Sequence, residues 1–449
     1  MDTPICDFVT QYANSNPLRL HMPGHKGLSR TGMESLDITE VDGADVLYSA
    51  KGIIKNSEKN ASALFGTAKT LYSTEGSSLG IRAMLYLATV YGRSLRRSPR
   101  ILAGRNAHKT FMTASALLDL DVVWLFPGSR SSILSCPISA MDLEIALLQM
   151  DELPIAVYLT NPDYLGNMVN LRPLAEVCHK YGILLLVDNA HGAYLHFLPQ
   201  PCHPMDLGAD LCCDSAHKTL PVLTGGAYLH ISKTAPEFLC EQAEFAMSLF
   251  ASTSPSYLLL QSLDEANRYL WDGYKNKLSV FGGKILNLKT ALQSKGFALA
   301  GSEVLKLTLA PKSFGYTGES LASILREQNI ECEFADPDYL VMMLTPEIPP
   351  EDLERLESIL LSIERRSPIL QQPPPITQAI KKLSVREAIL SLSEEEAIRF
   401  CRGKILASAG ITCPPALPIL ICGEEITEEA IACMEYYGIT HCRVVKEQL

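Results

Sequence analysis

Apolar runs alternate with amphipathic stretches through residues 100–240, and this alternation is the strongest constraint on what the chain can fold into. The expected strands are Ile101–Leu102, Val122–Leu125, Ile155–Leu159, Ile183–Val187 and Leu211–Cys213. Helical patterns fall between them, at 108–118, 140–149 and 171–181. Near-continuous apolar strands separated by helices predict a mostly parallel sheet covered on both faces. We therefore expect ligands at the carboxyl ends of the strands.

Composition excludes several classes of function. The chain has 449 residues, 47% of them apolar, and a net charge of −11. A chain this acidic is a poor partner for nucleic acid, and no apolar run approaches the ~20 residues of a membrane span. Its 13 cysteines are scattered without a CxxC pair, which favours reduced core thiols in a cytoplasmic protein over a metal site.

The order of patterns along the chain predicts several domains. Pro and Gly in His21–Gly27 indicate an irregular N-terminal arm. After the linker, a continuous helix is expected over Val385–Gly403. The predicted division is an arm (1–55), a large domain (56–270), a small α/β domain (271–370), a Pro-rich linker (371–383) and a C-terminal domain (384–449).

One lysine stands out by its position. His-Lys occurs four times in the chain, so the dipeptide itself is uninformative. Lys218, however, follows the strand Leu211–Cys213 and precedes the small residues Gly225 and Gly226. Asp188 ends the neighbouring apolar run. An amine able to form a Schiff base and an acid at a strand end are two parts of a pyridoxal phosphate (PLP) site.

A Gly/Ser turn supplies a third part. Thr74–Gly80 lies between the short strand Thr70–Ser73 and a predicted helix, where free N–H groups and the helix dipole attract anions. Many such turns are only helix caps. As a phosphate cup it would comprise Gly76, Ser77 and Ser78, helped by Ser215 and His217. His108 could stack on the ring and His191 could reach its O3′ oxygen.

These motifs, taken in order, resemble the ornithine/lysine/arginine decarboxylases of the fold-type I PLP enzymes. The resemblance covers the large domain and continues into the tail, at Pro414–Glu425. The stretches that carry it in the large domain are His21–Gly27 (HMPGHKG), Asp37–Tyr48 (DITEVDGADVLY), Thr74–Gly80, Arg105–Thr110 (RNAHKT), Asp188–Gly192 (DNAHG), Ser215–Leu220 (SAHKTL) and Ser252–Tyr257 (STSPSY).

The resemblance implies an α/β fold, with a large domain built on a mostly parallel seven-stranded type of sheet, a small α/β domain and an α/β tail. It implies a cytoplasmic lyase of polyamine biosynthesis, in the shorter branch without an N-terminal wing, which decarboxylates arginine, lysine or ornithine to a di- or polyamine and CO2. Lys218, His108 and Asp188 would be catalytic. Thr253 would reach the phosphate of a neighbouring subunit, so at least a homodimer is expected. The cofactor-binding set is Gly76, Ser77, Ser78, His108, Asp188, His191, Ser215, His217, Lys218 and Thr253.

Two alternatives share this cofactor frame. One is a PLP-dependent aminotransferase, which commonly holds the substrate α-carboxylate with an arginine of the small domain. Between Arg326 and Arg355 the chain has neither arginine nor lysine, which favours decarboxylation. The other is a PLP-binding protein without turnover, since Glu75 stands where the family has asparagine. For the distal cation of a substrate, the candidate carboxylates are Asp45, Glu333 and Asp336.

Overall fold

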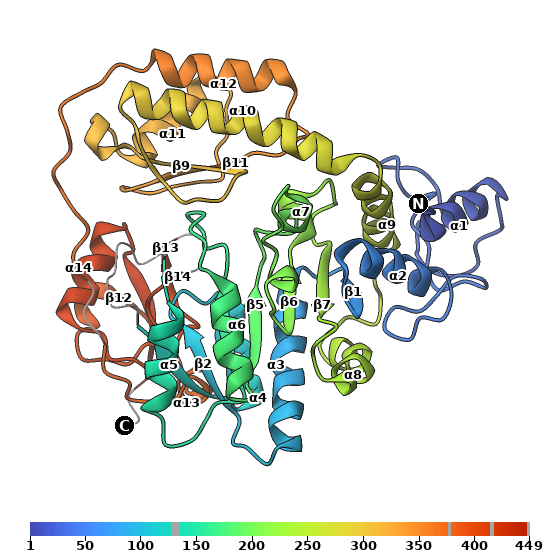
Figure 1. Ribbon diagram of the computed structural model, residues 1–449, viewed down its shortest axis with the longest axis horizontal. Helices are drawn as coiled ribbons and strands as arrows, with labels where there is room; N and C mark the ends of the chain where they lie inside the picture. The colour runs from blue at the N-terminus through green and yellow to red at the C-terminus, as the bar shows by residue number, and fades with distance from the viewer. Residues whose placement is uncertain (127–134, 376–378, 414–416, 447–449) are drawn as a thin grey trace. The chain divides into compact units, whose positions relative to one another are not determined.

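The computed structural model describes residues 1–126, 135–375, 379–413 and 417–446 (Figure 1). Pro414 and Pro415, part of the predicted C-terminal motif, lie outside the described residues. The chain forms two compact units, the first made of Met1–Arg96 and Leu171–Ser279, the second of Arg97–Asn170 and Val280–Leu449. This partition differs from the predicted domains, whose boundaries stay a prediction.

Seven strands form the main sheet in the order β1-β7-β6-β5-β4-β2-β3 (Figure 1). The pairs β2–β3, β2–β4 and β5–β6 are parallel, whereas β7 runs antiparallel to both β1 and β6. The predicted α/β fold with a mostly parallel sheet is confirmed. The strands are β1 (Lys69–Ser73), β2 (Arg100–Gly104), β3 (Asp121–Leu125), β4 (Ala156–Thr160), β5 (Leu184–Asp188), β6 (Leu211–Asp214) and β7 (Ala227–Ile231).

The first unit holds β1, β5, β6 and β7 together with most of the longer helices that flank them. Its core gathers aromatic rings, with Phe65 lying 4.6 Å from the His230 ring and 5.2 Å from the Phe197 ring, centroid to centroid. The elements are α2 (Ile53–Phe65), α3 (Ser77–Ser94), α6 (Leu171–Lys180), η1 (Leu195–Phe197), η2 (Pro204–Asp206), α7 (Ala216–Thr219), α8 (Glu237–Ser248) and α9 (Tyr257–Trp271).

The expectation of an irregular arm is wrong for its first residues, which form helix α1 (Pro4–Asn14). Ile5 and Val9 are buried, and a carboxylate oxygen of Asp264 accepts the N–H groups of Ile5 and Cys6 at 2.9 and 3.0 Å. This helix start is therefore capped by a residue some 260 positions further on, which no local pattern can reveal.

The second unit contributes β2, β3 and β4, and a four-stranded sheet in the order β10-β11-β9-β8. All three pairings of that smaller sheet are antiparallel. Helix α10 (Tyr274–Lys295) starts in the first unit and ends in the second. The remaining elements are α4 (Lys109–Leu118), α5 (Ala140–Leu148), β8 (Ala298–Ala300), β9 (Lys306–Ala310), η3 (Pro311–Phe314), α11 (Gly318–Glu327), β10 (Phe334–Ala335), β11 (Leu340–Met343) and α12 (Pro350–Ser362).

The tail corrects the predicted helix Val385–Gly403. Helix α13 ends at Leu390, and Ser393–Ala397 form strand β12 along β15 (His441–Val445). Glu394–Glu396 favour a helix by propensity, but pairing with β15 and burial of Ile398 and Cys401 in the tail core override it. The tail elements are α13 (Val385–Leu390), β12, η4 (Ile398–Phe400), β13 (Ile411–Cys413), β14 (Leu417–Leu420), α14 (Glu428–Tyr436) and β15.

Among the described helices, none combines the length and apolarity needed to cross a membrane. The cysteine side chains that the structure describes are free thiols.

Candidate active site

The Gly/Ser turn connects β1 to α3. Gly76, the residue before the helix, has φ +71° and ψ −178°, a conformation open only to glycine. Its N–H donates to the Gly225 carbonyl at 2.7 Å. Gly76 has no side chain to cap α3, and the first helical turn holds no acidic residue. An 18-residue helix thus begins with the positive end of its dipole beside two serines, as an anion site requires.

Glu75, the acidic residue in this turn, is exposed and points elsewhere. Its Oε1 accepts the backbone N–H of Ser252 at 2.7 Å. The carboxylate is therefore engaged with the segment that carries Thr253. That segment and the arm line a cavity of about 310 Å³, which includes Asp37–Glu40 and Thr253–Tyr257. Thr253 itself is exposed, and its predicted role toward a neighbouring subunit stays a prediction.

Helix α7, directly after β6, carries Lys218 and His217. Ser215 precedes the helix, and its hydroxyl donates to the Ser77 hydroxyl at 2.8 Å, so this turn meets the phosphate turn. The Nδ1 of His217 lies 3.1 Å from the Gly226 carbonyl. Burial lowers the pKa of His217, against the opposing effect of that hydrogen bond, which favours a neutral ring.

The turn after β5 carries Asp188 and His191. Strands β5 and β6 are parallel neighbours, so the two turns leave the sheet at the same edge. Asp188 is 2% exposed, and its Oδ1 accepts the Ala190 N–H at 3.2 Å. Lys218 Nζ lies 3.1 Å from His191 Nε2. The first unit therefore brings together Gly76, Ser77, Ser215 and the pair Lys218–His191, with Asp188 on the adjoining strand.

His108 belongs to the second unit, where it begins helix α4. Its Nδ1 accepts the Thr110 N–H at 3.2 Å, which fixes the ring orientation at the helix start. Three residues earlier, the Arg105 guanidinium donates two hydrogen bonds of 2.7 Å to Glu424 in the tail. Stacking of His108 on a cofactor ring stays a prediction.

The candidates for a substrate's distal cation differ in what their carboxylates already bind. Asp45 accepts four backbone N–H groups at the start of α2, from residues 51, 52, 54 and 55, so it serves as a helix cap. Asp336 accepts two backbone N–H groups, and burial raises its pKa to about 6. Glu333 is exposed, accepts the Tyr164 hydroxyl at 3.0 Å and lines a cavity of about 650 Å³. Of the three candidates, Glu333 therefore has the carboxylate with most remaining capacity to accept hydrogen bonds from a substrate's cation.

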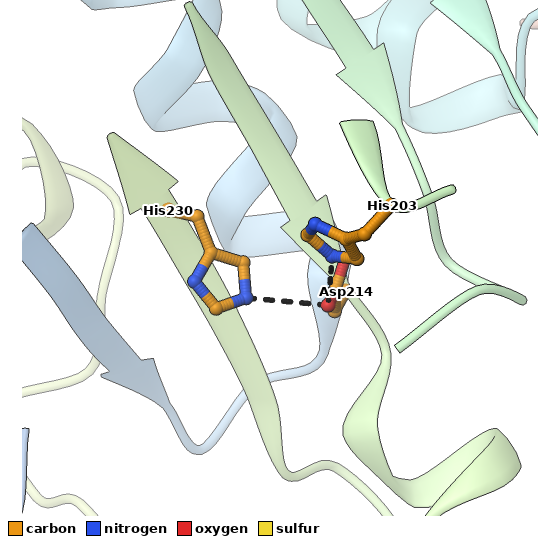
Figure 2. Close-up of side chains that lie close together, drawn as sticks. All are labelled: His203, Asp214 and His230. Atoms are coloured by element: carbon orange, nitrogen blue, oxygen red, sulfur yellow. Dashed lines mark hydrogen bonds and ion pairs between the residues drawn. The ribbon is translucent and has the colours of Figure 1, made fainter. Parts of the chain in front are cut away.

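A buried cluster next to the site was not anticipated from the sequence. Within the described part of the chain, His203, Asp214 and His230 form the one group of side chains spaced closely enough to hold a metal ion. Figure 2 shows both imidazole rings turned toward the Asp214 carboxylate. However, the Met205 N–H donates to His203 Nδ1 at 3.2 Å, so a neutral His203 carries its proton on Nε2 and donates it to Asp214. That nitrogen has no lone pair left for a metal.

The donor set suits PLP. A lysine amine beside an imidazole, a buried carboxylate on the adjoining strand, and two serines at an uncapped helix start match the imine, pyridine-nitrogen and phosphate positions of that cofactor. The Thr219 hydroxyl, next to Lys218, is buried and has no hydrogen-bond partner. The residues present therefore fit the group.

Comparison with a family model decides the family. The model described as Orn/Lys/Arg decarboxylase, major domain, matches residues 3–310. The chain belongs to the Orn/Lys/Arg decarboxylase family. This is a family of PLP-dependent amino-acid decarboxylases, and the chain has the length of its shorter members.

Relatives of the Orn/Lys/Arg decarboxylase family match over nearly the whole chain. The uncharacterized protein YaaO of Bacillus subtilis is 31% identical, over 96% of this chain and 93% of its own. The arginine decarboxylase of Bacillus subtilis is 30% identical, over 96% and 92%. Lysine decarboxylase A of Pseudomonas aeruginosa has the same fold, with a TM-score of 0.81 at 15% identity, covering 99% of this chain and 80% of that one.

Proposed function

We propose that the chain is a PLP-dependent decarboxylase of a basic amino acid, with arginine the substrate to test first. The observation that carries the proposal is the 3.1 Å contact between Lys218 Nζ and His191 Nε2, one strand away from buried Asp188. Membership of the family supports decarboxylation. The 27–30% identity to four proteins named arginine decarboxylase supports the choice of arginine.

The chain's own residues have distinct tasks in this proposal. When bound, PLP withdraws the electron pair that loss of CO2 leaves on the substrate α-carbon. Lys218 would hold the cofactor and, with His191 at its amine, can hold or pass a proton there. Asp188, buried at the end of β5, would keep a proton on the pyridine nitrogen. The start of α3, Ser77 and Ser215 would bind the phosphate.

The decisive experiment supplies the purified full chain with PLP and, separately, arginine, lysine or ornithine. We expect CO2 together with agmatine, cadaverine or putrescine from one of them. An aminotransferase would instead convert the amino acid to its 2-oxoacid when a second 2-oxoacid is present. A binding protein without turnover would show the visible absorbance of bound PLP and no product from any of the three, which would contradict the proposal.

Lys218→Ala tests the assignment of the lysine. We expect loss of the visible cofactor absorbance and a fall in rate of about 10²-fold or more. Lys180→Ala is the matched control, because Lys180 also follows a histidine but is exposed on α6; it should behave as wild type. If the absorbance survives in Lys218→Ala, another lysine holds the cofactor.

The proposal includes a homodimer in the cytoplasm. The exposed segment around Thr253, held by Glu75, is the part of the first unit expected to reach a neighbouring subunit. Sedimentation analysis of the PLP-loaded protein should give at least twice the mass of 49.3 kDa. A monomer that still decarboxylates its substrate would remove Thr253 from the site.

A further inference from the structure

Asp214 lies between the two turns that carry the candidate active site. It ends β6 and precedes Ser215, and it is 0% exposed. Its Oδ2 lies 2.9 Å from His203 Nε2 and 3.2 Å from His230 Nε2 (Figure 2). Its Oδ1 accepts the side-chain N–H of Asn189 at 2.7 Å. Donors from three other segments therefore converge on one buried carboxylate, and the Cys212 thiol of β6 donates to its Oδ1 at 3.9 Å.

The hydrogen-bond donors of this cluster are neutral and the acceptor is charged. His203 receives the Met205 N–H at Nδ1, so its Nε2 is the donor. Burial lowers the pKa of His230, which also favours a neutral ring. Burial acts to raise the pKa of Asp214, but the two histidines that bond its Oδ2 hold that pKa well below its ordinary value. Hydrogen bonds from the protein thus replace those of water around one buried anion.

Asn189 connects this anion to the turn after β5. Its backbone N–H donates to the Cys213 carbonyl at 3.0 Å, in addition to its side-chain bond to Asp214. A Cβ at position 192 would lie 2.0 Å from Asn189 Oδ1, so the side chain occupies space that only Gly192 leaves open. Asp188 precedes Asn189, and His191 is two residues beyond it. The direction of both side chains thus depends on how Asn189 is held.

We propose that Asp214 and Asn189 are positioning residues that hold the Asp188–His191 turn against the Ser215–Lys218 turn. Neither side chain needs to touch a ligand. Their hydrogen bond determines the distance between Lys218 and His191 and the position of Asp188 relative to the pyridine ring. The inference rests on the proposed function for the identity of the cofactor, but the coupling of the two turns exists in the protein alone.

Asp214→Asn is the first test, because the new amide keeps the size of the side chain. Its Nδ2 would face the Asn189 amide donor, so the two turns lose their link. We expect PLP to bind at least tenfold more weakly, its visible absorbance to titrate at a different pH, and amide exchange in residues 188–192 and 215–219 of the cofactor-free protein to accelerate. Unchanged affinity, titration and exchange in a folded Asp214→Asn protein would overturn the proposal.

The reciprocal double variant, Asn189→Asp together with Asp214→Asn, restores one donor and one acceptor with the direction reversed. The amide introduced at position 214 could then donate to the carboxylate introduced at position 189, while the amide oxygen accepts from the two imidazoles. We expect this swap to recover most of the PLP affinity and exchange protection lost in the single variant. If the swap is no better than Asp214→Asn alone, the Asn189–Asp214 bond is not what holds the turns.

Asp210→Asn is the matched control. Asp210 is also buried (3% exposed), also pairs with a histidine, and precedes β6 at its opposite end. Asp210→Asn should change stability but not PLP affinity. An equal loss of affinity would show that the effect comes from general damage to β6 and would overturn the proposal.

Should Asp214→Asn fail to fold, Asn189→Ala is the second variant, because it leaves both imidazole donors on Asp214. Wild-type PLP affinity and exchange in Asn189→Ala would equally overturn the proposal. If the wild type binds no PLP, the proposed function fails, and the exchange measurements still decide the positioning role.

Discussion

Two buried carboxylates, Asp214 in the first unit and Glu424 in the second, each fix a segment that carries a predicted site residue, and they do so differently. Asp214 accepts only from neutral donors, namely two imidazoles, an amide and a thiol. Glu424 accepts two 2.7 Å hydrogen bonds from the Arg105 guanidinium and one from the Ile421 N–H. In the first cluster, several neutral groups stabilise one charge by hydrogen bonds. The second is an ion pair, in which each charge depends on the other.

This difference determines how much stability the protein loses when one partner of each cluster is removed. Removing one donor from Asp214 leaves the anion with three others. Removing Glu424 leaves a buried guanidinium without a counter-charge, which is among the most destabilising single changes in proteins. The second unit therefore depends more sharply on one residue than the first does.

The largest effect is expected from Glu424→Ala. Arg105, 6% exposed, would be left uncompensated, and we expect the second unit to lose about 3–5 kcal/mol. Urea unfolding followed by the fluorescence of half-buried Trp124, in a Trp271→Phe background, reports on that unit. Glu428→Ala is the control, since Glu428 and Arg402 form an exposed pair, 74% and 73% exposed, worth less than about 1 kcal/mol. Equal midpoints for the two variants would remove the contrast.

The Arg105–Glu424 pair also shows where prediction from sequence stops. Arg105–Thr110 carries part of the family resemblance and Glu424 belongs to the predicted C-terminal motif, but nothing in the sequence pairs residues 319 positions apart. Asn189 follows Asp188 in the sequence, and His230 lies inside the apolar strand β7. Neither position indicates a contact with Asp214. Local patterns predict strands and turns because burial has a period. They do not predict which buried polar group meets which.

Where local pattern and tertiary pairing agree, prediction from sequence succeeds. Strands β1 to β6 and helices α4, α5 and α6 coincide with expected segments within a few residues, because apolar runs and amphipathic periods are local. The strand β12 is predicted as a helix because the pairing with β15 is remote. In the site, Lys218 and His191 lie in contact, while the roles of His108 and Thr253 stay predictions.

A second, smaller effect is expected from His230→Phe. The phenyl ring keeps the packing against Phe65 but removes one donor from Asp214, for which we expect a loss of about 1–3 kcal/mol in the first unit. Amide exchange in β6 at increasing urea measures it. The control His179→Phe removes a donor from Asp210 where the histidine side chain is 43% exposed, and should cost less than about 1 kcal/mol. A loss as large as that of Glu424→Ala would show that neutral donors are no more forgiving than an ion pair.

A third carboxylate, Glu58 in α2, extends the comparison to a group with few donors. It is 4% exposed and accepts the Tyr72 N–H at 3.0 Å, and burial raises its pKa from 4.5 to about 8. The folded protein therefore favours the neutral acid: this contribution to stability is complete below pH 4.5 and is lost as the pH rises to about 8. Glu58→Gln does not titrate, so we expect it to be more stable than wild type at pH 9 and equal to it near pH 4.5. Calorimetry at both pH values tests the sign, and a variant less stable than wild type at pH 9 would contradict it.

The smallest effect is expected where both charges of the ion pair are removed together. Arg105→Met/Glu424→Met fills a similar volume with apolar side chains, and replacing a buried pair in this way is often neutral. The Ile421 N–H loses an acceptor, so we expect a stability within about 1 kcal/mol of wild type, far above that of Glu424→Ala, by the same fluorescence measurement. A double variant as unstable as the single one would mean that the attraction itself, and not the avoidance of a lone charge, holds the tail to the segment before His108. In that case the second unit, like the first, would owe its site geometry to a specific polar contact rather than to apolar packing around it.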